Sequence, residues 1–278
     1  MIVGIAGLGL IGGSLAKSIK ANTPHTVYGL DNNDDTMMLA TISRTIDAPL
    51  TEENLPDCDL VLIALPPRAL VNWLNKNAPI IKKGGLVVDM CGIKRWIVGE
   101  ALPLSKQYGF TYVGGHPMAG KEVSGFVNAT EELYLGASMI LTPDSSVSIN
   151  ILDELRTFFL SIGFGKITFT TPETHDRTIA YTSQLAHIAS SSYIKSPTAQ
   201  LHSGFSAGSF RDMTRVAKLD ENLWTELFSE NSDYLIEELE EYIGHLNDFL
   251  SALKSDDLET VHSLLRDGRE LKEKSAKL

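Results

Sequence analysis

Cysteine is scarce in this sequence. Its 278 residues include only Cys58 and Cys91, and these two do not form a CxxC pair. A small secreted domain held together by disulfides, or a metal site built from cysteine pairs, would need more cysteines at closer spacing. We therefore expect two reduced thiols, no metal site and a cytoplasmic location.

Long apolar runs are also missing. The chain begins MIVGIAGLGLIGGSLAKSIK, with no charge between the initial Met and Lys17, but five glycines interrupt this stretch. A membrane span needs about 18 consecutive apolar residues, and an export signal would carry basic residues before its apolar segment. A buried helix would lose roughly 0.5 to 1 kcal/mol for each interior glycine. The glycines therefore need another explanation.

Positive charge is in short supply. Lys and Arg number 24 against 35 Asp and Glu, which gives a net charge of -11. Such a chain repels a phosphate backbone, so DNA and RNA are poor partners. We find no low-complexity segment and no internal repeat, and a length of 278 residues predicts about two domains.

The glycines form the pattern Gly7-x-Gly9-x-x-Gly12 between a predicted strand at residues 2–6 and a predicted helix after Gly9. In a dinucleotide-binding turn, the first glycine makes the turn, the second lets a pyrophosphate approach the backbone, and the third lets helix and strand pack closely. The helix N-terminus then offers amide donors to the phosphates. The pattern alone is weak evidence.

An acidic residue strengthens it. The next predicted strand, at 25–30, is followed by Asp31, nineteen residues after Gly12, where a carboxylate would accept hydrogen bonds from the adenosine ribose. The same carboxylate would repel a 2′-phosphate, so we expect NAD rather than NADP. A glycine-rich turn with an unrelated acid is the simpler alternative. The predicted cofactor contacts are Gly7, Leu8, Gly9, Leu10, Ile11, Gly12, Asp31, Leu65 and Pro66.

Apolar strands and helices continue to alternate as far as residue 169. Further strands are predicted at 59–65, 86–89, 110–113 and 166–169, and helices at 68–77, 95–108 and 151–160. This order predicts an α/β domain with a Rossmann-type doubly wound parallel sheet over residues 1–169. Ligands of such sheets bind beyond the carboxyl ends of the strands.

No convincing strand is predicted from residue 170 to 278, which we expect to form an all-α domain. Leucines and other apolar residues recur at three- and four-residue spacing over 235–253 and again over 258–265. Two antiparallel amphipathic helices of this kind could form a homodimer contact or pack only within the chain, and the sequence leaves both open.

The stretch YVGGHPMAG places His116 just beyond a strand end. A carbinol that loses hydride must also lose its hydroxyl proton, and a neutral imidazole is a suitable acceptor near pH 7. His116 is therefore the candidate general base, although a single histidine is often only structural.

Two polar segments follow in the helical half. Ser183, Gln184 and His187 would share one face of a helix and could line a polar pocket, or they could bond neighbouring helices. Arg211 and Arg215 flank Asp212, so one guanidinium could hold a substrate carboxylate while the other pairs with Asp212. A solvated charged face is the alternative.

Together these residues resemble the prephenate and arogenate dehydrogenases of tyrosine biosynthesis. The resemblance rests on the glycine pattern, GGHPMAG at 114–120, Glu122, SQLAH at 183–187, and SFRDMTRVAK at 209–218 followed by Trp224. It implies a homodimer that converts prephenate to 4-hydroxyphenylpyruvate with NAD or NADP. It also implies that His116 is the catalytic histidine and that the substrate contacts include Arg215, Ser183, His187, Gln184, Gly92 and Trp224.

One position departs from the family pattern. Many relatives carry serine in a GSxK element where this chain has Cys91-Gly92-Ile93-Lys94, so Gly92 brings no hydroxyl. Three other functions stay open on sequence: an arogenate dehydrogenase that makes tyrosine directly, a β-hydroxyacid dehydrogenase that uses Lys94, and a nicotinamide-binding regulator without chemistry.

Overall fold

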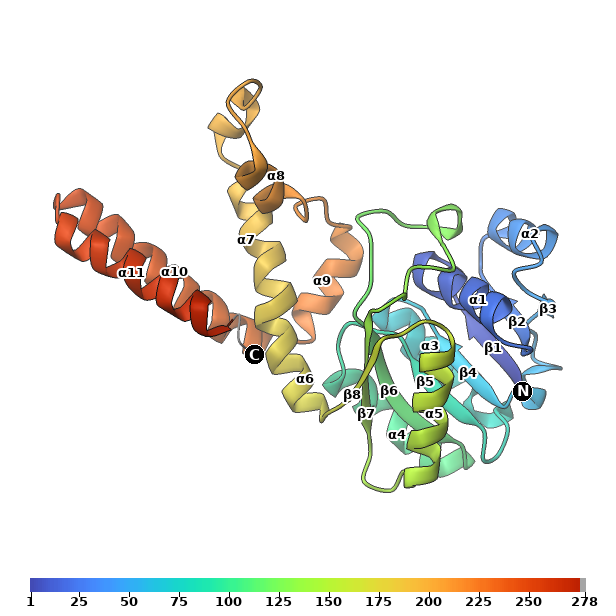
Figure 1. Cartoon of the computed structure of the whole chain (residues 1–278). Helices are drawn as coiled ribbons and strands as arrows, with labels where there is room; N and C mark the ends of the chain where they lie inside the picture. The colour runs from blue at the N-terminus through green and yellow to red at the C-terminus, as the bar shows by residue number, and fades with distance from the viewer. Residues whose placement is uncertain (276–278) are drawn as a thin grey trace. The chain divides into compact units, whose positions relative to one another are not determined.

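The computed structural model describes residues 1–275, which fall into two compact units (Figure 1). The first unit is Met1–Asn231, and the second begins at Ser232. All strands of the described residues lie in the first unit. The predicted domain boundary after residue 169 coincides with the end of the last strand at Phe169. It stays a prediction, because the compact units divide at a later residue.

The first unit is built on one sheet of eight strands in the order β3-β2-β1-β4-β5-β6-β7-β8. Every neighbouring pair is parallel except β6 and β7, which run antiparallel. The strands are β1 Ile2–Ala6, β2 Thr26–Leu30, β3 Ala48–Pro49, β4 Leu60–Ile63, β5 Leu86–Asp89, β6 Thr111–Pro117, β7 Ser138–Pro143 and β8 Lys166–Phe169.

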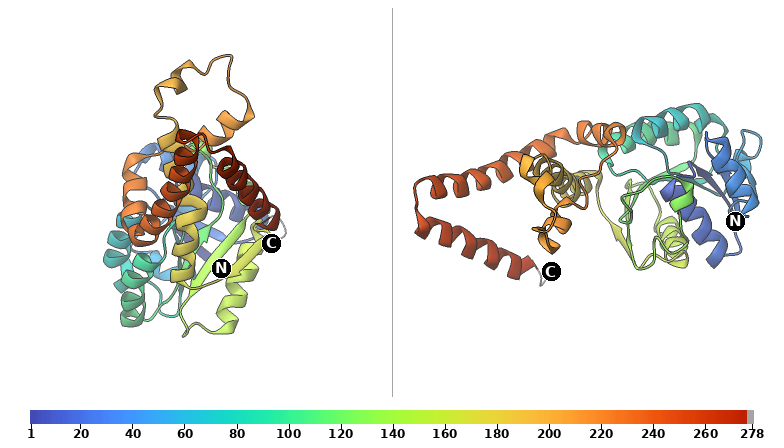
Figure 2. Two further views of the ribbon diagram at one scale, coloured as in Figure 1. Left: turned by 90° about the vertical axis from the view of Figure 1, so that its left-hand side faces the viewer. Right: turned by 90° about the horizontal axis from the view of Figure 1, so that it is seen from above.

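Helices cover both faces of this sheet (Figure 2). One core packs α1, α2 and α5 against one face, and a second packs α3, α4 and part of α9 against the other. The central strands are buried on both sides, which explains why they are continuous apolar runs in the sequence. The helix bounds are α1 Leu10–Asn22, α2 Asp34–Ile42, α3 Pro67–Asn77, α4 Arg95–Tyr108, α5 Ile149–Ser161 and α9 Glu221–Ser229.

A nearly continuous helix over residues 172–193 follows the last strand, β8. Thr171 caps α6, Pro172–Ile179, by accepting a hydrogen bond from the Thr174 amide. A π-helical turn, η4 at Ala180–Leu185, joins α6 to α7 at Ala186–Tyr193. The helix α8, Gly208–Thr214, follows. Short 3-10 turns complete the unit: η1 Leu55–Asp57, η2 Ala78–Ile80, η3 Phe126–Asn128 and η5 Pro197–Leu201.

The second unit consists of α10, Ser232–Lys254, and α11, Leu258–Ser275, which run in opposite directions (Figure 2). Several apolar side chains on these helices stay largely exposed, among them Ile243, Leu246, Leu250, Leu253 and Leu265. Within residues 1–275 no helix combines the length and apolar character that crossing a bilayer requires.

The fold confirms the predicted Rossmann-type sheet followed by helices. Two predictions were incomplete: the sheet is not wholly parallel, and β3, β7 and α2 were missed. β3 has only two residues. β7, SMILTP, lies where no α-helix separates it from β6, so the strand–helix alternation that reveals parallel strands gives no signal there.

Candidate active site

The three glycines of the N-terminal turn play different parts. Gly7 has φ +90, a left-handed conformation that L side chains rarely adopt, and its amide donates to the Leu30 carbonyl at 2.7 Å. A Cβ on Gly12 would lie 1.8 Å from the Gly7 oxygen, so only glycine lets α1 start this close to β1. A Cβ on Gly9 would meet no atom within 4 Å. Gly9 therefore faces open space, as a site for approaching phosphates requires.

The other predicted cofactor residues surround this turn. Asp31, at the carboxyl end of β2, accepts hydrogen bonds from the Leu8 amide at 2.8 Å and the Asn33 amide at 3.0 Å. Leu10 and Ile11 begin α1, which has no side-chain cap on its first amides. Leu65 and Pro66 follow β4, and the Leu65 side chain packs beside Gly7. The open turn, the uncapped helix start and the carboxylate together fit a dinucleotide.

His116 lies near the carboxyl end of β6, the sheet edge where ligands of this fold bind. It is partly buried, and its Nδ1 lies 2.8 Å from Nε2 of His175. His175 Nδ1 in turn lies 2.7 Å from the Asp176 carboxylate. His175 and Asp176 are consecutive residues of α6, so one turn of this helix supplies both the hydrogen-bond partner of His116 and the carboxylate behind that partner.

The Asp176 carboxylate is itself held on all sides. It accepts hydrogen bonds from the backbone amides of Lys94 and Arg95, at 2.7 and 2.8 Å, where α4 begins. The Arg95 Nε also points to it at 3.4 Å. Burial alone would raise the pKa of Asp176, but the His175 hydrogen bond and these amides outweigh burial and lower it. The carboxylate is therefore ionised at neutral pH.

The His116 imidazole is uncharged at neutral pH. Burial lowers its pKa well below the ordinary 6.5, and the neighbouring His175 and the Lys94 ammonium lower it further. Burial also lowers the pKa of His175, an effect that the Asp176 hydrogen bond opposes. An unprotonated imidazole can accept a proton from a substrate hydroxyl.

Lys94 has a different environment from His116. Its side chain is fully buried and its ammonium pairs with the equally buried Asp89. Asp89 also accepts hydrogen bonds from the Tyr112 hydroxyl at 2.5 Å and the Cys91 amide at 2.8 Å. Lys94 therefore belongs to a buried network, from which its charge lowers the pKa values of His116 and His175.

A pocket of about 740 Å³ gathers several of the predicted residues from distant parts of the chain. Glu122 comes from the loop after β6, His187 from α7, Arg215 from the end of α8, and Trp224 from α9. Arg215 forms an ion pair with Glu122. The His187 and Trp224 rings lie 3.9 Å apart, and His187 Nδ1 is 3.1 Å from the Val216 carbonyl.

The helix α9 connects this pocket with His116. Trp224 lines the pocket, and Leu227, three residues further along, lies beside Gly92. A Cβ on Gly92 would be 3.4 Å from Leu227 Cδ2 and 3.9 Å from His116 Nε2. Gly92 therefore faces the Cε1–Nε2 edge of the His116 ring, whereas Nδ1 meets His175.

The π-turn separates residues that a regular helix would group. Gln184 is buried, donates to the Leu227 carbonyl at 3.0 Å and accepts from Asn231 at 2.8 Å, whereas His187 lines the pocket and Ser183 is partly buried. Gln184 therefore faces Leu227 and Asn231 and does not line the pocket. Arg211 is exposed on α8.

Sequence reasoning missed His175 and Asp176. The TPETHD segment revealed only a helix start, because nothing in it predicts that its histidine will meet a strand residue 59 positions earlier. No group of three or more His, Cys, Asp or Glu side chains able to hold a metal occurs within residues 1–275.

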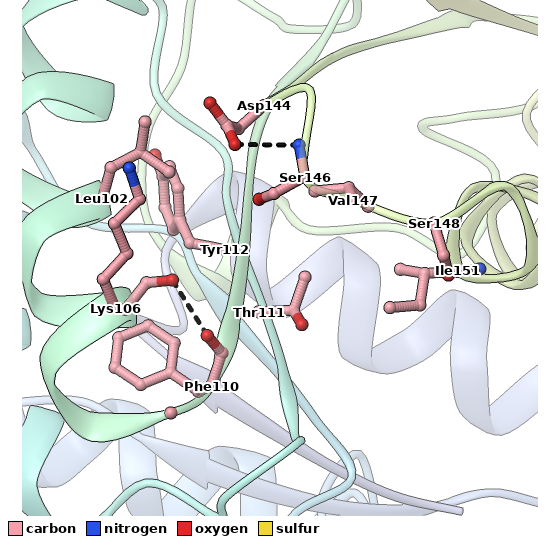
Figure 3. Close-up of a pocket in the computed structure, with 12 residues that line it drawn as sticks. Leu102, Lys106, Phe110, Thr111, Tyr112, Asp144, Ser146, Val147, Ser148 and Ile151 are labelled. Atoms are coloured by element: carbon pink, nitrogen blue, oxygen red, sulfur yellow. Dashed lines mark hydrogen bonds between the residues drawn. The ribbon is translucent and has the colours of Figure 1, made fainter.

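A smaller pocket of about 330 Å³ lies at the other end of β6, between α4 and the start of α5 (Figure 3). Lys106, Asp144 and Ser148 are among its lining residues, and Asp144 accepts a hydrogen bond from the Ser146 amide at 3.0 Å. None of the predicted site residues lines it. This pocket lies at the opposite end of the strands from His116 and His175.

This fold, its open glycine turn and the partly buried histidine at the strand ends define a nucleotide-dependent dehydrogenase. A family model described as the nucleotide-binding domain of prephenate dehydrogenase matches residues 15–167. A second model, the dimerization domain of prephenate dehydrogenase, matches residues 171–267. The chain belongs to the prephenate dehydrogenase family and is an enzyme.

Individual relatives agree with this assignment. The chain is 30% identical to the prephenate dehydrogenase of Bacillus subtilis (strain 168), over 98% of this chain and 77% of that protein. It is 27% identical to a prephenate dehydrogenase from A. aeolicus solved with hydroxyphenyl propionate and NAD+, with a TM-score of 0.85 over 100% and 98% of the two chains. Synechocystis arogenate dehydrogenase is 26% identical, with a TM-score of 0.82 over 99% and 100%.

Proposed function

We propose that this enzyme converts prephenate to 4-hydroxyphenylpyruvate and CO₂ by oxidative decarboxylation with NAD. The observation that carries the proposal is a neutral, partly buried histidine at the ligand-binding end of a dinucleotide-binding sheet, in a structure whose pocket also contains an arginine. The family and the NAD+ complex of a similar structure support the same chemistry.

His116 is the proposed base. Bound NAD would accept the hydride from ring C4, and His116 Nε2 would take the hydroxyl proton as C4 becomes a carbonyl. The C1 carboxylate can then leave as CO₂, because the electron pair of the bond between C1 and the carboxylate moves into the ring and restores its aromaticity. The C4 oxygen becomes a phenolate, which the protonated His116 can reprotonate. No second base is needed for that step, so the protein contributes mainly orientation and charge.

The pocket residues are the proposed substrate contacts. Arg215 would bind a substrate carboxylate, and Trp224 and His187 would form a wall beside the ring. Gly92 would lie next to the reacting hydroxyl, where the open space could admit substrate or water. Ser183 would contribute from the substrate-side helix, and Gln184, which bonds Asn231, would act by holding that helix in place.

Asp31 supports NAD over NADP. Its carboxylate stands at the end of β2 and would repel a 2′-phosphate. Rates measured with prephenate and with arogenate, each with NAD and with NADP, test the proposal. We expect the highest kcat/KM for prephenate with NAD. An equal or higher value with NADP would contradict the role of Asp31, and a higher value with arogenate would make the enzyme an arogenate dehydrogenase, as the similar Synechocystis protein is named.

The β-hydroxyacid dehydrogenase alternative is not supported. It requires a lysine that reaches the substrate, whereas Lys94 is buried against Asp89. Turnover of a simple β-hydroxyacid, lost in Lys94→Ala and kept in His116→Ala, would revive it. Tight NADH binding with no turnover of any of these substrates would instead indicate a regulator.

We also propose a homodimer formed through α10 and α11. Leu246 and Leu250 are each about half exposed on α10, and fully burying such a side chain is worth about 1.5 to 3 kcal/mol. Replacing both with Glu should shift the mass measured by light scattering from dimer to monomer, while Asp248→Asn on the same helix should not. A wild-type monomer would contradict the proposal. The two buried, unpaired cysteines support a cytoplasmic location.

A further inference from the structure

His116, His175 and Asp176 form a chain of hydrogen-bonded side chains. The carboxylate of Asp176 decides which partner donates in each of these hydrogen bonds. Asp176 is the far end, where a carboxylate can only accept. His175 lies between, with Nδ1 2.7 Å from Asp176 and Nε2 2.8 Å from His116 Nδ1. This inference rests on the proposed function, because it concerns the same base.

The direction follows from counting donors. Asp176 is ionised and accepts at both oxygens from the amides of Lys94 and Arg95, so it cannot donate to His175. His175 must therefore carry its proton on Nδ1, and a neutral His175 has a bare Nε2. That bare nitrogen can only accept, so His116 must donate to it from Nδ1.

We infer that His175 and Asp176 are positioning residues that hold His116 as the Nδ1–H tautomer, which leaves the Nε2 lone pair free to accept the substrate proton. Nε2 is the nitrogen on the side of Gly92, where a Cβ would be 3.9 Å away. Without the partner, His116 can also place its proton on Nε2, and in that tautomer Nε2 cannot accept the substrate proton. Neither partner touches the reacting atoms.

The anchoring of Asp176 makes the arrangement rigid. Its oxygens complete the first turn of α4, and its backbone carbonyl accepts from Asn231 at 2.9 Å. Rotation of the carboxylate would leave buried amides unpaired, which costs about 1 to 3 kcal/mol for each group. The carboxylate therefore cannot turn away from His175 when the substrate binds.

The tautomer can be measured directly on the substrate-free enzyme. The nitrogen shifts of histidine side chains in 15N-labelled protein distinguish a protonated from a bare ring nitrogen, and His116→Asn identifies the His116 signals among the seven histidines. At pH 7.5 we expect a protonated Nδ1 and a bare Nε2 on His116. A protonated Nε2 with a bare Nδ1 would overturn the inference without any variant of His175.

Two variants of His175 separate positioning from packing. In His175→Phe, which keeps the ring but removes the acceptor, we expect His116 to populate the Nε2–H tautomer and kcat to fall by about 10- to 100-fold, with KM and NADH affinity within threefold. In His175→Gln, the amide oxygen can accept from His116 and the NH₂ can donate to Asp176, so most activity should return. A kcat for His175→Phe within twofold of wild type would overturn the inference.

Failure of the proposed function would look different. An enzyme that does not turn over prephenate, but shows the Nδ1–H tautomer in wild type and loses it in His175→Phe, would keep the positioning role and lose the substrate. If His175→Phe fails to fold, the wild-type spectrum and the activity of His175→Gln still decide the question. A His175→Gln enzyme with a protonated His116 Nε2 and full activity would refute the link between tautomer and rate.

Discussion

Arg215 is the residue whose replacement tests the proposed substrate pocket most directly. Its side chain is 63% exposed and its partner Glu122 is 40% exposed. Exposed ion pairs of this kind contribute about 0.2 to 1 kcal/mol, so Arg215→Ala should change folding stability by less than about 1 kcal/mol. The variant should fold, and any large effect on kinetics must come from binding.

The expected kinetic effect is larger than the stability effect. A hydrogen bond from a charged group contributes about 1.5 to 3 kcal/mol, and leaving a substrate carboxylate partly buried without a partner costs more. Removing the guanidinium should therefore raise KM for prephenate by roughly 10- to 100-fold if KM tracks Kd, with little change in NAD affinity. In the wild type, the ion pair of Arg215 with Glu122 must break when the substrate binds, so the net contribution of Arg215 to substrate affinity is smaller than that of the new contact alone.

Steady-state rates with saturating NAD, with NAD affinity measured by fluorescence, provide the assay. Arg211→Ala is the matched control, since it removes another exposed arginine of α8 that does not line the pocket. Glu122→Gln should lower KM, by at most about fivefold, because it removes the competing carboxylate. A larger rise in KM for Arg211→Ala than for Arg215→Ala, or unfolding of Arg215→Ala, would refute this placement of the substrate carboxylate.

Other predictions concern the base and the cofactor turn. His116→Asn should lower kcat by about 10² to 10⁴ with cofactor affinity nearly unchanged, and a kcat within twofold of wild type would remove His116 from the mechanism. Because burial lowers the pKa of His116 below 6.5, the base stays unprotonated on mild acidification, and the acidic limb of kcat against pH should have its midpoint below 6.5; a midpoint above 6.5 would contradict this. Gly12→Ala should lower the melting temperature, because its Cβ meets the Gly7 oxygen, whereas Gly9→Ala should melt like wild type but bind NADH more weakly. Equal melting and equal NADH affinity in both variants would show that the turn does not hold the cofactor.

The sheet and the cofactor turn could be predicted because each depends on local signals. The buried strands are apolar runs, and the three glycines are needed for steric reasons that involve residues close to one another in the sequence. The structure gives each glycine the part expected from the pattern: a left-handed turn at Gly7, open space at Gly9 and close packing at Gly12. Because these steric requirements involve nearby residues, they can be recognised from a single sequence.

The surroundings of His116 could not be predicted in the same way. Its partner comes from α6, after a stretch of chain that includes an unpredicted antiparallel strand, β7. The π-turn at Ala180–Leu185 also breaks the helical spacing on which the grouping of Ser183, Gln184 and His187 depended. Contacts between distant segments and a single extra residue in a helix leave no periodic trace in the sequence.

Gly92 stands where many members of the family carry a serine. The resemblance raised the question of what orients His116 when the family's serine is absent. In this structure the orientation comes from the other ring nitrogen, Nδ1, which meets His175. Nothing near Gly92 is needed to hold the imidazole, and the nearest atoms to a Cβ there, on Leu227 and His116, are at ordinary contact distances of 3.4 and 3.9 Å. The base can thus keep its alignment with an open Nε2 side, and the role left for a hydroxyl at this position is to contact the substrate.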